Sequence, residues 1–486
     1  MVELSREGTR REWRFGEVAD RAARLAGTFA AQGVRRGDVV MTLIGNRPEW
    51  VFAMVACFRA GAVVLPCTEQ LRAKDLRLRL DAARPRLVLA DERNAAELSA
   101  ALALPAAGAA AHGPEPVVLT IPDEALYAAE PAPAVELASE DPCLITFTSG
   151  TAGEPKGVLH GQRYLSGQHV QAEHWLDARP GDLVWCTAAS GWSKSARNVF
   201  IAPWIRGAAA LLHDARFDPH ERLELLQREQ VNVLCMAPTE YRVIAKRAQP
   251  RPVSALRGLV AAGEALNPEV LRAFHAASGL WIRDGYGQTE TGQLTGAPLG
   301  EEIRPGSMGR PLPGVELRVE DGELVADPRT VPTFFLGYLT SAQGAGPVRG
   351  GPALEPLPAA PTWRTGDRVH QDEDGFLFFE GRADDVIISA GYRIGPFEVE
   401  SALVAHPAVA EAAVVAALDE ERGAIVRAVV VLRAGGAPSD ALARELQEHV
   451  KETTAPYKYP RRIDFAAELP KTSSGKVRRA LLREQG

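Results

Sequence analysis

Apolar positions with helical spacing run over residues 15–32 and stop at Gly33, where a glycine commonly ends a helix. A continuous apolar run follows at 39–44, then a second helical stretch at 49–59, then another apolar run at 62–67. Strand, helix and strand at this spacing predict a crossover unit, because parallel strands need a long connection. We therefore expect an α/β fold to begin near the start of the chain.

Short apolar runs separated by helical stretches continue through the first half of the chain. Those that predict buried strands lie at 87–90, 183–186, 231–236, 256–261 and 280–286. Residues 101–140 and 341–361 are instead rich in small residues and proline, with little periodicity, so we expect loops there rather than core elements. The predicted fold class is α/β, with layered sheets in a large N-terminal domain.

The pattern changes near residue 381 to a compact α+β arrangement. It predicts helices at 396–405 and 439–452 and strands at 409–417 and 424–432. A chain of 486 residues is also too long for a single core. We therefore expect two domains, 1–381 and 382–486, with the segment GRADD at their junction.

Composition excludes several classes of function. A net charge of −7 offers no basic surface to a nucleic acid, so we expect no such partner. No apolar run approaches the roughly 18 residues of a membrane span, and none follows the basic N-terminus, so we expect neither a membrane segment nor a secretory signal. Five cysteines lie in apolar stretches without a CxxC pair, which favours buried thiols in the cytoplasm.

Lysine is rare in this chain, because only eight of the 55 basic residues are lysine and arginine supplies the rest. The two can exchange on a solvated surface, but a guanidinium is a poor substitute where a compact ammonium must meet a phosphate. A lysine inside a glycine- or serine-rich motif is therefore a candidate for chemistry. Lys156 and Lys476 both lie in such motifs.

The strongest local signal is LITFTSGTAGEPKGV at 144–158, in which an apolar strand runs into glycines, hydroxyls and a lysine. Glycine lets backbone N–H groups approach an anion closely, and the hydroxyls and the lysine add donors and charge. The residues that we expect to grip a phosphate are Thr148, Ser149, Gly150, Thr151, Gly153 and Lys156. A plain surface turn is the alternative, and the spacing is not that of a Walker loop.

A second cluster, RDGYGQTETG at 283–292, also follows an apolar strand. Mg²⁺ commonly takes one or two protein oxygens together with phosphate oxygens, and Glu290 beside Thr289 supplies that minimum. The segment AAGEAL at 261–266 follows another strand, at the edge where open α/β sheets bind ligands. On its own, each segment is more often a structural turn than a site.

Six segments together resemble, in the same order, the motifs of the acyl-adenylate-forming enzymes, most closely the medium-chain acyl-CoA and acetyl-CoA synthetases. They are TSGTAGEPKG, AGEAL, DGYGQTETG, TWRTGD, GRADDVIISAGYRIGPFEVESAL and PKTSSGKVRR, and they cover nearly the whole chain. The resemblance implies a large N-terminal domain of layered α/β sheets with a small β-rich subdomain, and a small, mobile α+β C-terminal domain. It also implies ATP and Mg²⁺ between the domains, with a carboxylic acid and coenzyme A as the other substrates.

The resemblance implies roles for individual nucleotide-binding residues. The adenine pocket would comprise Gly263, Glu264, Ala265, Asp284, Gly285, Tyr286, Gly287, Gln288 and Thr289. Asp367 would accept hydrogen bonds from both ribose hydroxyls, since a carboxylate has two acceptor oxygens. Arg382 and Arg393 would add further nucleotide contacts, and Thr151 and Glu290 would hold Mg²⁺.

The implied catalytic residues are Lys476, Lys156, Thr289 and Glu290. Lys476 would reach the reacting carboxylate and phosphate and stabilise their charge. Asp384 would be the hinge about which the C-terminal domain rotates after the first step. Rotation would bring Gly391, Tyr392 and Arg422 to the passage of coenzyme A.

The identity of the acid rests on one departure from the acetate-specific relatives. They carry a tryptophan where this chain has Gly287, so we expect a medium-chain fatty or aromatic acid, with Trp192 lining its pocket. Two alternatives stay open: a stand-alone adenylating enzyme that loads a carrier protein, and a non-catalytic nucleotide-binding homologue. A homodimer is a further expectation.

Overall fold

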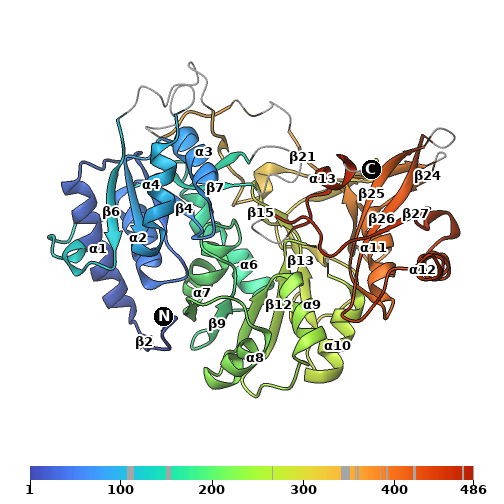
Figure 1. Cartoon of the computed structure of the whole chain (residues 1–486). Helices are drawn as coiled ribbons and strands as arrows, with labels where there is room; N and C mark the ends of the chain where they lie inside the picture. Colours follow the sequence, from blue (N-terminus) through green and yellow to red (C-terminus); the bar gives the residue numbers. More distant parts are fainter. Residues whose placement is uncertain are drawn as a thin grey trace.

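The computed structural model describes most of the chain. Outside the described residues lie 107–113, 149–154, 265, 341–350, 356, 358–360, 384, 390–391, 420–422, 473–475 and 485–486, and for Arg393 only the backbone is described. The C-terminal part, orange to red in Figure 1, packs beside the larger N-terminal part.

One seven-stranded sheet has the order β20-β8-β7-β4-β3-β5-β6. Its strands are β3 (Val39–Leu43), β4 (Val63–Cys67), β5 (Leu87–Asp91), β6 (Val117–Ile121), β7 (Pro142–Phe147), β8 (Gly157–Gly161) and β20 (Gly337–Tyr338). The five strands from β7 to β6 are parallel, as the crossover pattern predicted. Every residue of β3 and β4 is buried, which explains their continuous apolar runs.

The second seven-stranded sheet has the order β13-β12-β11-β9-β10-β1-β2. Its strands are β1 (Val2–Leu4), β2 (Arg10–Glu12), β9 (Leu183–Cys186), β10 (Ala209–His213), β11 (Val233–Met236), β12 (Gly258–Ala262) and β13 (Ile282–Gly285). All neighbours are parallel except β1 and β2. The carboxyl ends of β9, β11, β12 and β13 therefore meet at one edge of the sheet.

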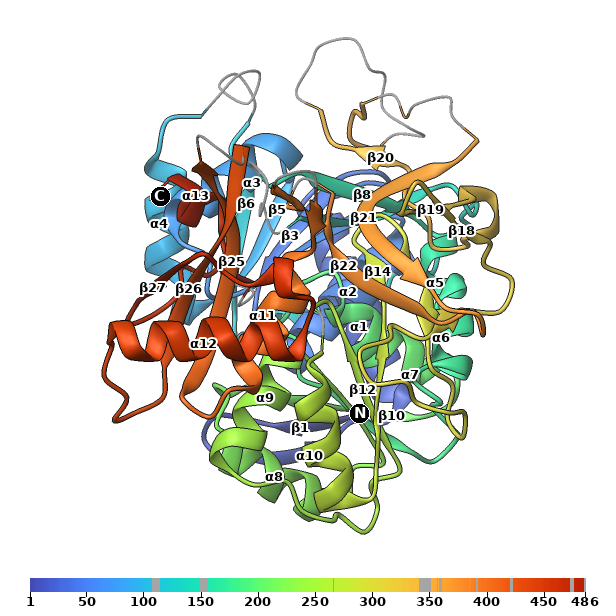
Figure 2. The same cartoon turned by 90° about the vertical axis from the view of Figure 1, so that its right-hand side faces the viewer.

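Helices cover both faces of each sheet in layers (Figures 1 and 2). The helices of the N-terminal part are α1 (Phe15–Ala31), α2 (Pro48–Ala60), α3 (Ala73–Ala83), α4 (Ala95–Ala103), α5 (Arg163–Gly167), α6 (His169–His174), α7 (Ala202–Ile205), α8 (Pro219–Arg228), α9 (Pro238–Arg247) and α10 (Pro268–Ser278). The π-helical segment η4 (Arg197–Ile201) runs directly into α7. The outer layers are α3 with α4 on one sheet and α8 to α10 on the other.

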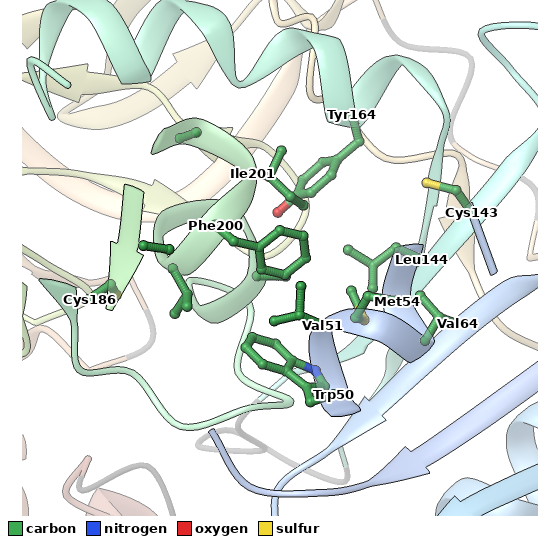
Figure 3. Close-up of a cluster of buried hydrophobic side chains, with 14 of the residues drawn as sticks. Trp50, Val51, Met54, Val64, Cys143, Leu144, Tyr164, Cys186, Phe200 and Ile201 are labelled. Atoms are coloured by element: carbon green, nitrogen blue, oxygen red, sulfur yellow. The ribbon is translucent and has the colours of Figure 1, made fainter. Parts of the chain in front are cut away.

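The main core lies between the two sheets, where α2 meets η4 (Figure 3). Trp50 of α2 packs edge-on against Phe200 of η4, with ring centroids 5.6 Å apart, and both side chains are buried. Aromatic pairs in this geometry add about 0.5–1.5 kcal/mol beyond the area that they bury. This contact joins the two sheets and holds η4 rigidly behind the site described below.

Two smaller regions complete the fold. A four-stranded antiparallel sheet contains β18 (Leu317–Glu320), β19 (Glu323–Ala326), β21 (Trp363–Gln371) and β22 (Leu377–Arg382), and short pairs join β14 (Gly287–Gln288) to β15 (Gly292–Gln293) and β16 (Thr295–Gly296) to β17 (Arg310–Pro311). The C-terminal part contains β23 (Ile387–Ser389), β24 (Tyr392–Ile394), α11 (Pro396–Ala405), β25 (Val409–Asp419), β26 (Gly423–Leu432), α12 (Asp440–Thr453), β27 (Arg462–Phe465) and α13 (Arg479–Glu484). The predicted fold class is confirmed.

The prediction that 101–140 forms only loop was wrong in part. Residues 117–121 form the edge strand β6, and Ile121 at its end is fully buried. The sequence of β6, VVLTI, is as apolar as the VVMTL of β3, so a local signal was present but lay within a segment rich in alanine and proline. A 3₁₀ turn then buries Leu126 and Tyr127 against α1. Within 341–361, Leu354 is buried and bridges Leu339, and most of that segment lies outside the described residues.

Across the described part of the chain, no helix combines the length and the apolar character that crossing a bilayer requires. All five cysteines are buried and free.

Candidate active site

The predicted motifs converge at the shared strand edge of the second sheet. Trp192 and Lys194 follow β9, Gly263 and Glu264 follow β12, and the segment 284–290 begins within β13. Parallel strands expose their carboxyl ends side by side, so loops distant in sequence come together there. The strand edge is covered by residues of the C-terminal part, including Lys476.

Asp367 is the centre of a hydrogen-bonded network at this edge. Its carboxylate accepts from the Tyr286 hydroxyl, from Gln288 Nε2 at 2.9 Å and from Arg382 Nη1 at 3.1 Å. Trp363 Nε1 holds the Gln288 side chain from the other end, at 3.0 Å from Oε1. Burial raises the pKa of Asp367 despite these donors. Four predicted nucleotide contacts are therefore one connected unit.

Glu264, predicted for the adenine pocket, lies among cations. It accepts from Thr239 Oγ1 at 2.8 Å and from Arg242 Nη2 at 2.9 Å. Burial alone would raise the pKa of Glu264, but the charges of Arg242, Lys194 and Lys476 hold it below its usual range. The carboxylate thus stays ionised beside these three cations, one of which, Lys476, belongs to the C-terminal part.

Lys476 is half-buried between the two parts of the chain. Burial lowers the pKa of its ammonium, Lys194 and Arg382 lower it further, and Glu264 and Asp367 act in the opposite direction. Its backbone N–H bonds Thr472 Oγ1 at 3.2 Å, which helps to close the turn that carries it. A lysine ten residues from the end of the chain therefore sits beside residues of the AGEAL and TWRTGD motifs.

Lys156 and Thr148 flank the predicted phosphate loop and are bonded to each other. The Thr148 N–H donates to the Lys156 carbonyl at 2.9 Å, and the Lys156 N–H donates to Thr148 Oγ1 at 3.0 Å. The Lys156 ammonium is exposed, 5.0 Å from the centre of the Tyr338 ring and 4.0 Å from Glu355 Oε2. Its contacts are loose, so it is free to turn towards an incoming anion.

The bonding of the Glu290 carboxylate shows whether this residue could act as a ligand of Mg²⁺. Tyr338 donates its hydroxyl to Glu290 Oε1 at 2.8 Å, and no described residue bonds Oε2. A half-buried carboxylate with one oxygen held and one open is a suitable ligand for an ion that takes its other oxygens from phosphate and water. Among the described residues, no three His, Cys, Asp or Glu side chains are grouped so that they could hold a metal ion.

Several predicted site residues lie outside the described residues. These are Ser149, Gly150, Thr151 and Gly153 of the phosphate loop, Ala265, the hinge Asp384, and Gly391 and Arg422. The Arg393 backbone pairs with Ile388 in the β23–β24 hairpin. Tyr392 on the same hairpin is 52% exposed and stacks on Tyr457, with ring centroids 4.4 Å apart, so it faces solvent rather than the nucleotide motifs.

The backbone of the neighbouring strand leaves no room for a side chain at Gly287. A Cβ added there would lie 1.9 Å from the Gly292 carbonyl oxygen, because β14 and β15 pair at this point. The glycine is therefore required by the hairpin, in addition to leaving a tryptophan out of the pocket. Gly285 is similarly enclosed, by Gln293, Thr295 and Trp175. Trp192 is half-buried and packs against the main core.

Sequence reasoning missed three residues that the fold brings to the site: Lys194, Arg242 and Tyr338. Lys194 Nζ donates to the Ala262 carbonyl at 3.0 Å and contributes charge beside Glu264 and Lys476. Its signal was present, because it is one of eight lysines and follows a strand in ASGWSKS. Nothing local marks Arg242 or Tyr338, since their partners are distant in sequence.

Asp284 provides a prediction about stability. It is buried, and burial raises its pKa to about 8 from an ordinary value of 3.8, although the Gly285 N–H bonds it at 2.8 Å. The native state therefore holds a proton that the unfolded chain has lost, and this contribution to stability disappears as pH rises from about 4 to 8. An Asp284→Asn variant cannot lose it. As pH rises, we expect the free energy of unfolding of Asp284→Asn to increase relative to that of the wild type by up to about 1.4 kcal/mol per pH unit.

The measurement is urea unfolding of the ligand-free protein between pH 5 and pH 8.5. Asp327→Asn is a control, since Asp327 has a pKa lowered by its bond to Arg329 and by the Arg329 N–H. A constant difference between Asp284→Asn and the wild type over this range would contradict the assignment of a protonated Asp284.

Comparison with known proteins assigns both parts of the chain to one enzyme family. Residues 2–342 match the family model described as AMP-binding enzyme, and residues 398–476 match the AMP-binding enzyme C-terminal domain. The chain is 39% identical to the uncharacterized acyl-CoA ligase YtcI of Bacillus subtilis (strain 168), over 98% of this chain and 91% of that protein. It is 38% identical to the mitochondrial acyl-coenzyme A synthetase ACSM4 of Homo sapiens, over 99% and 85%.

Two solved structures extend the likeness to three dimensions. The anthranilate CoA ligase AuaEII in complex with anthranoyl-AMP has a TM-score of 0.86 at 28% identity, with 100% of this chain and 93% of that chain covered. A benzoate CoA ligase from Burkholderia xenovorans LB400 has a TM-score of 0.85 at 27% identity, with 99% and 96% covered. The chain therefore belongs to the AMP-binding enzyme family and is an ATP-dependent, AMP-forming acyl-CoA synthetase.

Proposed function

We propose that this synthetase activates a medium-chain fatty or aromatic carboxylic acid, and that Lys476, Lys156, Thr289 and Glu290 carry the first step. The observation that supports these roles most directly is the position of Lys476. The ammonium of Lys476, which precedes α13, is within the electrostatic influence of both Glu264 and Asp367. A cation from the C-terminal part and two carboxylates from the N-terminal part thus influence one another where a nucleotide of this family would bind.

In the first step the carboxylate oxygen of the acid attacks the α-phosphorus of ATP. A bond forms between that oxygen and phosphorus, the bond to the β-phosphate oxygen breaks, and pyrophosphate leaves. Both reactants are anions, so the residues must hold them in line and offset the charge that grows on the phosphate oxygens. Lys476 offsets charge at the α-phosphate, and Lys156 offsets charge on the departing pyrophosphate.

Asp367 and Glu290 orient the nucleotide. Asp367 accepts from the ribose hydroxyls within the network of Tyr286, Gln288 and Arg382. Glu290, with Thr151 of the phosphate loop, would hold Mg²⁺, which supplies positive charge to the phosphates. Tyr338 keeps the Glu290 carboxylate in place.

In the second step the thiol of coenzyme A attacks the acyl carbon. A carbon–sulfur bond forms as the thiol loses its proton to solvent, the bond from that carbon to the phosphate oxygen breaks, and AMP leaves with that electron pair. For this step the C-terminal domain, 382–486, rotates about Asp384 and withdraws Lys476. Tyr392 now lies on an exposed face, and its exposure supports a surface that is buried only in the second arrangement.

Residues at the strand edge support the proposed class of substrate acid. Trp192 offers an apolar wall, and each methylene that such a wall buries contributes about 0.8 kcal/mol. The likeness to ligases whose names specify anthranilate and benzoate supports an aromatic acid as well. Buried free cysteines support action in the cytoplasm, and the open edge of β6, where Val118 is exposed, supports a homodimer.

We expect medium-chain acids or benzoate to give a higher kcat/KM than acetate. The measurement is acid-dependent release of AMP with coenzyme A, over the C2 to C12 acids and benzoate. A parallel series replaces coenzyme A with a phosphopantetheinylated carrier protein, which the carrier-loading alternative would favour. A preference for acetate would contradict the pocket argument, and no acid-dependent pyrophosphate exchange at all would contradict the proposed function.

A further inference from the structure

Arg197 is a buried cation that the mechanism above does not use. It is the first residue of η4 and only 4% exposed. Its side chain makes no hydrogen bond and no ion pair with any described residue, and its Nε is fully enclosed without an acceptor. Desolvating a guanidinium is costly unless an anion or several acceptors replace the lost water. Such a residue indicates a partner that the described part of the chain does not supply.

The guanidinium faces the hairpin of the YGQTETG motif. Nη1 lies 3.5 Å from the position that a Cβ on Gly292 would occupy. Its charge also reaches His160, whose pKa falls to about 3, first through burial and then through Arg197. His160 in turn lies against the backbone of Thr289 and Thr333. Arg197 therefore places a buried positive charge on this side of the hairpin, with a neutral imidazole beside it, and Arg163 acts on the same imidazole more weakly.

Neighbouring polar groups are also incompletely bonded. Gln171 donates Nε2 to Asn198 Oδ1 at 2.9 Å, yet Gln171 Oε1 and Asn198 Nδ2 have no partner among the described residues. Gln293 Oε1 and His160 Nδ1 are likewise buried and unpaired within the described part of the chain. Native interiors leave few such atoms, and a group of them marks a place for water or a polar ligand.

Two residues of the proposed acyl pocket are linked to these polar residues, one along the chain and one across the hairpin. Trp192 precedes Arg197 by five positions on the same segment, and Gly287 pairs with Gln293 across the hairpin. The reacting end of the acid belongs with Lys476, whose charged neighbours are Glu264, Lys194, Asp367 and Arg382. Arg197 instead meets the hairpin at Gly292. The guanidinium is thus suited to a second group on the acid, away from the carboxylate that reacts.

We propose that Arg197 binds an oxygen acceptor on the acyl group, so that the preferred acid carries a second carboxylate, a hydroxyl or a carbonyl oxygen in addition to the reacting carboxylate. The inference rests on the proposed function and narrows its substrate class. A plain alkyl chain would leave the guanidinium desolvated and unpaired when it displaced water. An oxygen-bearing acid would supply the acceptor, and a site built for such an acceptor rejects analogues that lack it.

The test compares matched acids on the full-length enzyme. Hexanoate is paired with hexanedioate and 6-hydroxyhexanoate, and benzoate with its ring-hydroxy and ring-carboxy derivatives, with kcat/KM taken from AMP release. We expect the wild type to prefer one oxygen-bearing acid by at least about tenfold over its plain counterpart, the range of one hydrogen bond to a charged group. Arg197→Met should lose that preference while its kcat/KM for the plain acid stays equal or rises. Arg197→Lys should keep part of it.

Arg206→Met is the matched control, because Arg206 caps α7, the helix that continues η4, and is partly exposed and paired with Glu173. Since Arg197 has no partner among the described residues, the melting temperature of ligand-free Arg197→Met should equal or exceed that of the wild type. An equal loss for plain and oxygen-bearing acids, or a marked fall in melting temperature, would show a structural role and overturn the inference. A wild type that prefers plain acids throughout would do the same. Absence of AMP release with every acid would instead reject the proposed function.

Discussion

Replacing Lys476 with alanine is expected to slow acyl-adenylate formation by about 10²–10³-fold, the usual loss when one preorganised donor to a developing charge is removed. The lysine is half-buried beside Glu264 and Asp367, so no water-exposed lysine of the tail can take its place. The measurement is acid-dependent exchange of radiolabelled pyrophosphate into ATP. The same variant should convert a supplied acyl-adenylate and coenzyme A to acyl-CoA at a near wild-type rate, because Lys476 withdraws before that step.

Lys471→Ala is the matched control for this experiment. Lys471 lies five residues earlier, is one-third exposed and pairs with Glu411 of the same domain. Its loss should leave both half-reactions unchanged. If Lys476→Ala exchanged pyrophosphate at the wild-type rate, the electrostatic role of Lys476 would have to be abandoned; if both half-reactions fell together, a folding defect would be the explanation.

Replacing Asp367 with alanine is expected to raise the KM for ATP by about 100-fold, which corresponds to roughly 3 kcal/mol of lost hydrogen bonding. The change removes the proposed ribose acceptor. It also leaves Tyr286, Gln288 and Arg382 without the carboxylate that they share. The KM for the acid should change much less, because Asp367 belongs to the nucleotide side of the site.

The measurement is initial-rate AMP release with ATP and acid varied separately. Asp372→Ala is the control, since Asp372 lies past the end of the same strand and pairs with Arg304 away from the site. A fall in kcat with an unchanged KM for ATP would argue against ribose binding. Thermal unfolding of both variants separates a lost contact from a loosened sheet, because unpaired buried donors also destabilise the fold.

The elements of the fold were largely predictable from the chain itself. Strands buried on both faces, such as β3 and β4, read as continuous apolar runs, and α2 begins at a proline and ends at a left-handed glycine, Gly61. The edge strand β6 was missed although its sequence, VVLTI, matches the pattern of β3. The segment around it is rich in alanine and proline, and its overall composition outweighed this short apolar run.

Some residues of the site could likewise be predicted from the sequence, and others could not. Glycine-rich turns, a rare lysine and strand ends carry a local signal, and this signal marks Lys156, Glu290 and Lys476 as candidates in the amino-acid sequence alone. The pairing of Tyr338 with Glu290 and of Arg242 with Glu264 carries none, because each pair joins residues many positions apart. Such pairs can be identified only once the fold brings the two residues within hydrogen-bonding distance.

The amino-acid sequence by itself established the α/β class, the positions of most helices and strands, and the phosphate-handling motifs, because these follow from local periodicity and side-chain chemistry. The folded chain was needed to show that Gly287 is enclosed by the Gly292 carbonyl, that Lys476 lies beside Glu264, and that Arg197 is buried without a partner among the described residues. Burial and charge pairing arise only when distant segments pack together. Desolvation then gives each of these groups a free-energy cost that no stretch of sequence displays.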